Sequence, residues 1–205
     1  AQLTSPVHDL DALPYPDFSA FYAQHARSST AVAHYPPVPI FETSRGCWWG
    51  AKHHCTFCGL NGATLAYRSK SQERAYHELA WLADRYGSDL INADNILDMR
   101  YFQDFLPRLA ERGPKVTMYF EAKANLRPEQ ITMLSKAGIK RLQPGLEALD
   151  SDLLRMMDKG CTKLQNVQLL KLAAENGTYV EWLALYGFPG ETPAQYQAMS
   201  RTIPL

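Results

Sequence analysis

The sequence has few cysteines, no excess of charge of either sign and no long apolar runs. Only four of its 205 residues are cysteines, too few for the disulfide framework of a small secreted domain. Its 21 basic residues balance 21 acidic ones, which argues against a nucleic-acid partner or an anionic membrane surface. No apolar run approaches the roughly 20 residues that cross a bilayer. We therefore expect a cytoplasmic protein with neither nucleic acid nor membrane as a partner.

Apolar segments alternate with helix signals from about residue 38 onward. Five strands are predicted, at residues 38–43, 89–93, 116–120, 139–142 and 179–186. Helices are predicted between them, starting after Ser71, near Phe102, at Pro128, at Ser151, at Lys163 and at Thr192. This alternation indicates an α/β fold with a parallel sheet and right-handed crossovers. No Gly-x-Gly-x-x-Gly motif follows the first strand, so a dinucleotide-binding fold is not expected.

The first 38 residues have a different character. They contain five prolines and no long apolar period, which predicts an extended connector, with a disordered tail as the alternative. Three aromatic residues, Phe18, Phe21 and Tyr22, favour a segment that docks on a surface. The chain starts at Ala1 without Met and stops soon after a new helix has begun. We therefore expect residues 39–205 to be the main domain of a segment from a longer protein.

Three of the four cysteines crowd into twelve positions directly after the first predicted strand. Cys47, Cys55 and Cys58 have the spacing C-x7-C-x2-C. Three thiolates can hold three irons of a [4Fe–4S] cubane and leave the fourth iron without a protein ligand. The alternative is zinc, because the same thiolates with His53 or His54 could form a tetrahedral site. Neither histidine is assigned a role. Cys161, about a hundred residues away, is interpreted as structural.

This loop resembles that of the radical S-adenosylmethionine (SAM) superfamily, whose usual spacing is the shorter C-x3-C-x2-C. The segments ETSRGCWWG (residues 42–50) and HHCTFCGLNG (residues 53–62) are similar to one subgroup in particular. That subgroup is the maturases of ribosomally made peptide natural products, often fused to an N-terminal cobalamin-binding domain. The resemblance implies a partial (β/α)6, TIM-like barrel, truncated after about the fifth strand. It also implies that residues 1–38 are the linker from a cobalamin-binding domain.

Residues that follow the later strands agree with the resemblance. Asp94 and Asn95 follow the second strand, where the superfamily holds the amino group of SAM. Glu121 and Lys123 follow the third, where members contact the ribose or the carboxylate of SAM. Glu147, after the fourth strand, fits the same scheme less sharply. The resemblance therefore implies that these five side chains bind SAM.

Two further contacts are implied with the adenine of SAM. The turn GFPGET at residues 187–192 is common in cobalamin-type members, and Gly187 and Gly190 would let the backbone approach the ring closely. Phe57, just before the last cysteine, would touch adenine through its backbone.

Ordinary structural roles stay open for many of these residues. Asp94 is also a candidate helix cap, Glu147 a cap for the next turn, and Glu121 with Lys123 a simple ion pair. The GFPGET turn is also a tight turn that leads into Thr192 as a helix cap. Trp48 and Trp49 are expected to pack the long loop against the sheet, or else to shield a cluster from water.

The implied reaction begins with a reduced cluster that donates one electron to SAM. Cleavage then gives methionine and a 5′-deoxyadenosyl radical, which removes a hydrogen from an unactivated carbon. The implied partners are a precursor peptide, methylated at carbon where a cobalamin domain lies upstream, and an electron donor such as a flavodoxin or ferredoxin. No catalytic side chain is assigned beyond the cluster ligands. Two alternatives remain: a non-catalytic zinc-binding module, and a relic that binds cluster and SAM without a substrate pocket.

Overall fold

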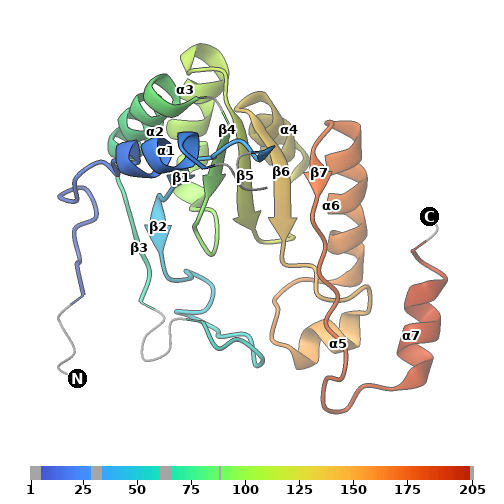
Figure 1. Cartoon of the computed structure of the whole chain (residues 1–205). Coiled ribbons are helices and arrows are strands. Elements are labelled where there is room, and N and C mark those ends of the chain that lie inside the picture. Colours follow the sequence, from blue (N-terminus) through green and yellow to red (C-terminus); the bar gives the residue numbers. More distant parts are fainter. Residues whose placement is uncertain (1–5, 29–33, 61–65, 88, 204–205) are drawn as a thin grey trace.

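The structure, a computed structural model, describes residues 6–28, 34–60, 66–87 and 89–203. Its centre is a parallel sheet of five strands in the order β1-β4-β5-β6-β7 (Figure 1). The strands are β1 (Ile40–Phe41), β4 (Asp89–Asn92), β5 (Thr117–Ala122), β6 (Ile139–Pro144) and β7 (Tyr179–Val180). Because the spatial order follows the chain order, right-handed crossovers all return on one side of the sheet. This confirms the predicted partial (β/α) barrel.

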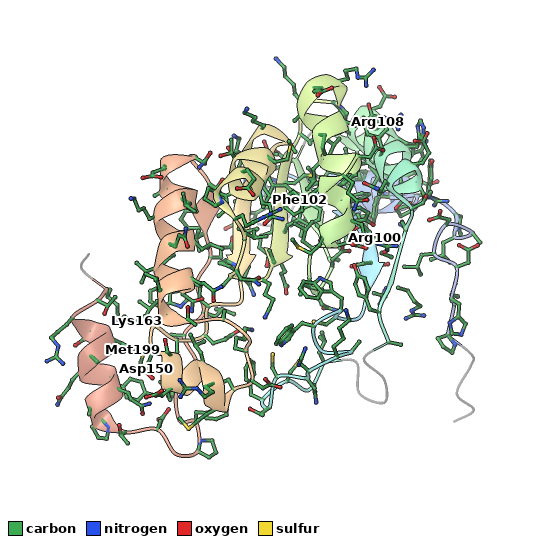
Figure 2. The ribbon with its side chains drawn as sticks, turned by 180° about the vertical axis from the view of Figure 1, so that it is seen from behind. Arg100, Phe102, Arg108, Asp150, Lys163 and Met199 are labelled. Atoms are coloured by element: carbon green, nitrogen blue, oxygen red, sulfur yellow. The ribbon has the colours of Figure 1, made fainter. Side chains whose placement is uncertain are left out.

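The helices begin at the caps that the sequence indicates. They are α2 (Gln72–Tyr86), α3 (Phe105–Arg112), α4 (Pro128–Lys136), α5 (Ser151–Met156), α6 (Lys163–Glu175) and α7 (Pro193–Ser200), with a 3-10 turn, η2 (Met99–Phe102), before α3. The Ser71 hydroxyl accepts a hydrogen bond from the Arg74 N–H, as expected of an N-cap. Lys163 at the start of α6 and Met199 of α7 lie near each other (Figure 2), and Lys163 Nζ donates to the hydroxyl of Thr202, just after α7, at 2.7 Å. Among the described helices, none is long and apolar enough to cross a membrane.

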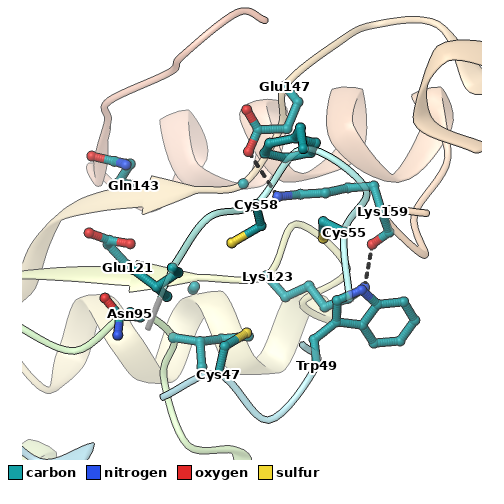
Figure 3. Close-up of a pocket in the computed structure, with 15 residues that line it drawn as sticks. Cys47, Trp49, Cys55, Cys58, Asn95, Glu121, Lys123, Gln143, Glu147 and Lys159 are labelled. Carbon is teal, nitrogen blue, oxygen red and sulfur yellow. Dashed lines mark hydrogen bonds and ion pairs between the residues drawn. The ribbon is translucent and has the colours of Figure 1, made fainter. Parts of the chain in front are cut away.

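The two faces of the sheet differ in chemistry. Met118 and Phe120 of β5 are buried on the helix side, while Tyr119 and Glu121 alternate with them on the opposite side. Glu121 lies in register with Gln143 of β6, so polar side chains share this second face (Figure 3). The helix-free face therefore offers polar groups to a ligand.

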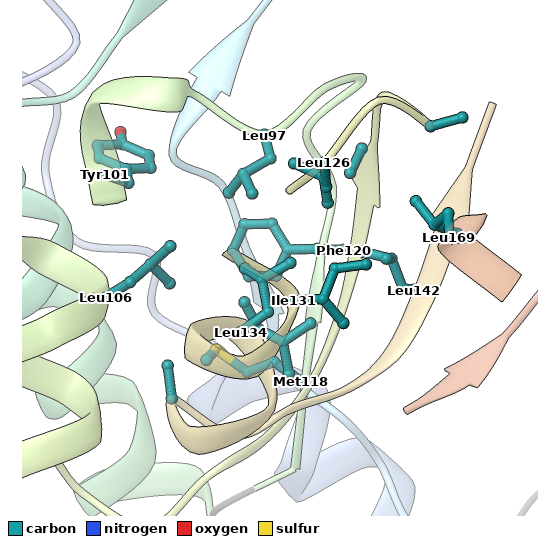
Figure 4. Packing of buried hydrophobic residues seen from close by; sticks show 14 of the residues in the cluster. Leu97, Tyr101, Leu106, Met118, Phe120, Leu126, Ile131, Leu134, Leu142 and Leu169 are labelled. Atoms are coloured by element: carbon teal, nitrogen blue, oxygen red, sulfur yellow. The ribbon is translucent and has the colours of Figure 1, made fainter. Parts of the chain in front are cut away.

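The hydrophobic core lies between the sheet and its helices. Phe120 and Leu142 are paired across β5 and β6 and are fully buried. Ile131 and Leu134 of α4 belong to the same cluster of buried side chains (Figure 4). Burial of each such side chain contributes about 1.5–3 kcal/mol, so the central strands are a rigid support for the loops at their ends.

The N-terminal segment contains a helix that the sequence did not predict. Helix α1 (Ser19–Ala26) buries none of its residues and has little apolar periodicity, which explains the missed prediction. The expected docking is confirmed for Phe18 and Tyr22, whose rings lie 5.7 Å and 5.0 Å from that of Tyr86, whereas Phe21 is 50% exposed and contacts rings of its own helix. Arg74 also donates to the carbonyl of Asp11 at 2.6 Å. The segment is thus fixed along α2.

The two outer strands are shorter than predicted. Pairing covers only Ile40–Phe41 within residues 38–43, and only Tyr179–Val180 within residues 179–186. In β6, Pro144 has no N–H to donate, so the ladder to β7 stops there and resumes only as a bridge between Glu147 and Ala184.

An antiparallel pair of strands flanks the cysteine loop and was not predicted. β2 (Ser44–Arg45) pairs with β3 (Arg68–Ser69). Each strand is only two residues long, too short to give an alternating apolar pattern in the sequence. The pair holds the two ends of the cysteine loop together.

Candidate metal and cofactor site

A pocket of about 300 Å³ lies at the carboxyl end of the central strands (Figure 3). This is the edge at which ligands bind in barrels and in open α/β sheets. The cysteine loop provides one wall, the residues after β4, β5 and β6 provide others, and Lys159 comes from the loop after α5. Eight of its lining residues were predicted from the sequence: Cys47, Cys55, Phe57, Cys58, Asn95, Glu121, Lys123 and Glu147.

All three cysteines of the loop line this pocket. The Gly50 N–H donates to Cys47 Sγ at 3.3 Å, and the Cys58 N–H donates to the Cys55 carbonyl at 3.0 Å. Burial raises the pKa of the Cys55 thiol, and Cys47 and Cys58 raise it further, while Lys159 acts in the opposite direction. Because all three cysteines line one pocket, a bound metal would offset the mutual repulsion of their thiolates.

Three cysteines around one pocket match the ligand set of a [4Fe–4S] cubane, and the two histidines of the loop have other partners. In the described part of the chain, no three His, Cys, Asp or Glu side chains are placed to hold one metal ion. His54 Nε2 instead pairs with the Cys58 carbonyl at 3.0 Å, and His53 stacks on Trp49 with 4.2 Å between ring centres. In a cubane each thiolate binds a different iron, so the sulfurs surround a larger group. Cys161 is buried and is absent from the pocket lining described.

Two tryptophans explain how the long gap between the first two cysteines is held. Trp48 Nε1 donates to the Leu97 carbonyl at 3.0 Å, and Trp49 Nε1 donates to the Asp158 carbonyl at 3.2 Å. The loop is thus attached to the segments that follow β4 and α5. Both indoles thus anchor the loop to segments beyond the strand and helix ends rather than to a strand itself, and Trp49 also lines the pocket.

Asp94 is buried, and it is absent from the pocket lining described. Its carboxylate accepts hydrogen bonds from the Thr43 N–H at 2.7 Å, from the Ser44 N–H at 2.9 Å and from the Thr43 hydroxyl. Burial raises the pKa of Asp94 to about 6, against the effect of these hydrogen bonds. It caps no helix, because the next turn is capped by Asp98. Asp94 therefore fixes the strand that leads into the loop.

Glu121 and Lys123 both line the pocket but do not pair. Burial raises the pKa of Glu121, and the nearby Asp94 raises it further. Lys123 Nζ donates to the carbonyls of Lys159 at 2.6 Å and Gly160 at 3.1 Å. Among the described residues no carboxylate forms an ion pair with Lys123, so the alternative of a Glu121–Lys123 pair is wrong.

Glu147 faces a partner that the sequence did not reveal. Its Oε1 lies 2.8 Å from Nζ of Lys159, and both side chains are largely buried. Its φ of +57° turns the chain after β6; Glu147 caps no helix, because Asp150 is the N-cap of α5. Lys159 Nζ also lies 5.3 Å from the ring centre of Phe57.

Sequence reasoning missed two polar residues of this pocket, Gln143 and Lys159. No motif marks Lys159, because it follows a short helix without any pattern of its own. Gln143 had a usable signal, since it occupies a strand end on the same face as Glu121.

The GFPGET turn lies outside the pocket lining. The N–H groups of Gly187 and Phe188 each donate to the Glu191 carboxylate at 2.8 Å, and Thr192 then caps α7. Gly187 and Gly190 have φ values of +78° and +91°, so the structural role of the turn is confirmed. The structure does not bring these glycines to Cys47, Cys55 and Cys58. Asn61 and Gly62, which end the loop motif, lie outside the described residues.

Comparisons with known proteins agree on one family. The sequence model of the Radical SAM superfamily matches residues 41–203. An uncharacterized methyltransferase of Pyrococcus horikoshii is 23% identical over 197 residues, covering 94% of this chain and 41% of that protein. The bacteriochlorophyllide d C-12(1)-methyltransferase of Chlorobaculum tepidum is 25% identical over 204 residues, covering 95% of this chain and 42% of that protein. The chain thus spans about two fifths of the length of these relatives.

Solved structures share the fold. The methyltransferase TsrM from Kitasatospora setae, with cobalamin and a [4Fe–4S] cluster bound, matches with a TM-score of 0.70 and 21% identity, over 82% of this chain and 32% of that one. The cobalamin-dependent SAM radical enzyme OxsB, with aqua-cobalamin and SAM bound, matches with a TM-score of 0.59 and 23% identity, over 74% of this chain and 24% of that one.

Proposed function

Because the chain belongs to the radical SAM superfamily, we propose that its pocket binds one [4Fe–4S] cluster and SAM. The observation that carries this proposal is the set of three thiolates around one pocket, with no fourth cysteine in the lining described. Cys47, Cys55 and Cys58 would each bind one iron, which leaves the fourth iron for the amino and carboxylate groups of SAM. When bound, the cluster supplies the electron that cleaves SAM, which is chemistry that side chains alone lack.

The polar wall of the pocket provides the proposed contacts for SAM. Glu121 and Asn95 carry acceptor oxygens at the ends of β5 and β4, suited to an ammonium group or ribose hydroxyls. Glu147 and Lys159 form an ion pair, so together they give this wall of the pocket polar groups without a net charge. The backbone beside Phe57 is the proposed contact for adenine.

Residues that lie outside the lining are proposed to act indirectly or from its rim. Asp94 holds Thr43 and Ser44, and so sets the position from which the cysteine loop starts. The turn with Gly187 and Gly190 is the proposed contact for the adenine side of SAM, made from outside the pocket lining described.

We further propose that the whole protein is a peptide-modifying enzyme that works with cobalamin. Similarity to methyltransferases supports methyl transfer, and the cobalamin bound by TsrM and OxsB supports the cofactor. The loop segments ETSRGCWWG and HHCTFCGLNG support a ribosomally made precursor peptide as substrate. A flavodoxin or ferredoxin is the proposed electron donor, and residues 1–38 the proposed link to a cobalamin-binding domain.

Anaerobic reconstitution with iron and sulfide tests the first part of this proposal. The expected product is a brown protein with about four irons and four sulfides per chain, which forms 5′-deoxyadenosine from SAM and dithionite. A colourless protein that retains one zinc and leaves SAM intact would contradict it. Transfer of label from methyl-labelled SAM to a carbon of the precursor peptide, by the full-length protein, tests the second part.

A further inference from the structure

Lys123 is a buried cation without an anionic side-chain partner in the described structure. Only 5% of the residue is exposed. Its Nζ lies 2.6 Å from the carbonyl oxygen of Lys159, 3.1 Å from that of Gly160 and 3.3 Å from the ring centre of Trp49. An ammonium group has three N–H donors, and two carbonyls and one indole face account for all three. Burial of a charge costs free energy unless an opposite charge compensates it. We therefore expect an anion near Lys123.

Cysteines line the same pocket as Lys123 and are candidates for that anion. Burial lowers the pKa of Lys123, and the neighbouring Lys159 also lowers it, whereas Cys161, Cys55 and Cys47 act to raise it. Two of the three belong to the loop that lines the pocket. Glu121 and Glu147 line the same pocket, but neither forms an ion pair with Lys123 in the described structure.

The contacts of Lys123 also join three separate segments. Lys123 follows β5, Trp49 belongs to the cysteine loop, and Gly160 follows α5. Gly160 has a φ of +63°, and a β-carbon there would lie 2.1 Å from Cζ2 of Trp49 and 2.9 Å from Nζ of Lys123. Only glycine leaves room for the indole and the ammonium group together.

We propose that Lys123 is a positioning residue whose fixed positive charge raises the reduction potential of the cluster held by Cys47, Cys55 and Cys58. This inference rests on the proposed cluster. Three thiolates bring more negative charge than the oxidised cubane core offsets, and reduction adds one more electron. A nearby cation in a low-dielectric site stabilises the reduced form more than the oxidised form. Trp49 and the two carbonyls hold the ammonium group in place.

The test compares two neutral variants, Lys123→Met and Lys123→Gln, with Lys123→Arg, which keeps the charge. Lys171→Met is the matched control, because Lys171 is 74% exposed on α6 and its removal changes the net charge equally. Each full-chain protein is reconstituted anaerobically, its iron and sulfide are counted, and its midpoint potential is measured by EPR-monitored titration. Amide hydrogen exchange of residues 47–58 in the cluster-free proteins gives a second readout that needs no cofactor.

We expect both neutral variants to have a more negative midpoint potential than the wild type, while Lys123→Arg restores most of the shift and Lys171→Met has none. Exchange in the loop should be faster in the neutral variants even where cluster loading fails. Neutral variants with wild-type potential and wild-type exchange would overturn the inference while the proposed function stands. A wild-type protein that takes up no iron would overturn both.

Discussion

Trp49 lies directly against Gly160, so closely that a β-carbon on this glycine would stand 2.1 Å from Cζ2 of the indole. We expect Gly160→Ala to displace Trp49 and loosen the cysteine loop. Gly177→Ala is a matched control, because Gly177 has the same φ of +63° but no atom within 4 Å of the place its β-carbon would take. Both variants incur the left-handed backbone cost of about 1–2 kcal/mol, and only Gly160→Ala adds overpacking of about 1–3 kcal/mol.

Urea denaturation of the two variants checks this prediction. Gly160→Ala should have the lower free energy of unfolding, and its cysteine loop should be cleaved faster in limited proteolysis. Equal stability and equal cleavage of the two variants would mean that the contact between Trp49 and Gly160 does not constrain the loop.

Asp94 gives a prediction about pH. Its pKa is raised to about 6 by burial, so between pH 4 and 6 the folded protein binds this proton more tightly than the unfolded chain does. Stability contributed by Asp94 is therefore greatest at the low end of this range and falls as the pH rises through about 6. Asp94→Asn should remove this dependence. From pH 4 to pH 7, the free energy of unfolding of the variant should therefore increase relative to that of the wild type.

Chemical denaturation of both proteins at several pH values measures that gap. A gap that does not change with pH would show that Asp94 titrates alike in the folded and unfolded states. Asp94→Ala serves as a further check, because it strands the buried N–H groups of Thr43 and Ser44 and should be destabilising by about 2 kcal/mol or more at any pH.

Glu78 links two cations inside the fold. Its carboxylate lies 2.7 Å from Nζ of Lys70 and 2.9 Å from Arg74, and the side chains of Glu78 and Lys70 are 1% and 5% exposed. Glu78→Gln should lower the free energy of unfolding by about 3–5 kcal/mol, because it leaves a buried cation uncompensated. Glu73→Gln on the same helix should cost about 1 kcal/mol or less, since Glu73 is 63% exposed. Similar losses for the two variants in thermal or urea melts would refute this difference.

The proposed ligand assignment predicts that alanine substitution prevents cluster assembly at three of the four cysteines and not at the fourth. Alanine at Cys47, Cys55 or Cys58 should prevent assembly of an intact cubane, because each removes the only protein ligand to one iron. Cys161→Ala should keep the full iron and sulfide content, since Cys161 lies outside the pocket lining described. Iron and sulfide analysis with visible absorbance distinguishes the groups. Full loading of Cys55→Ala would contradict the assignment.

The features that could be predicted are those marked by residues close together in the sequence. Caps such as Ser71 act within one turn of their helix, and alternation along β5 separates buried Phe120 from pocket-facing Glu121. The cysteines could be predicted because their spacing lies within a single loop. Such features depend on neighbours in the sequence, and they set the order of strands and the edge at which the pocket forms.

The features that escaped prediction depend on partners far apart in the sequence. Helix α1 is held by the ring of Tyr86 rather than by an apolar face of its own. The predicted contact of Lys123 with SAM stays a prediction, but the sequence did not show that its ammonium group also contacts a loop after α5 and an indole of the cysteine loop. Nothing in the local sequence of Lys123 reveals either partner, because the contacts arise only when the strands align.

The proposed function depends on Cys47, Cys55 and Cys58 holding one cubane with an iron open to SAM. EPR of the dithionite-reduced protein, recorded with and without SAM, tests whether SAM binds the iron that has no cysteine ligand. We expect a single [4Fe–4S] signal whose g values change when SAM is added, because SAM binds the iron that has no cysteine. A signal indifferent to SAM, or a protein that assembles no cubane at all, would show that the three cysteines do not form this site.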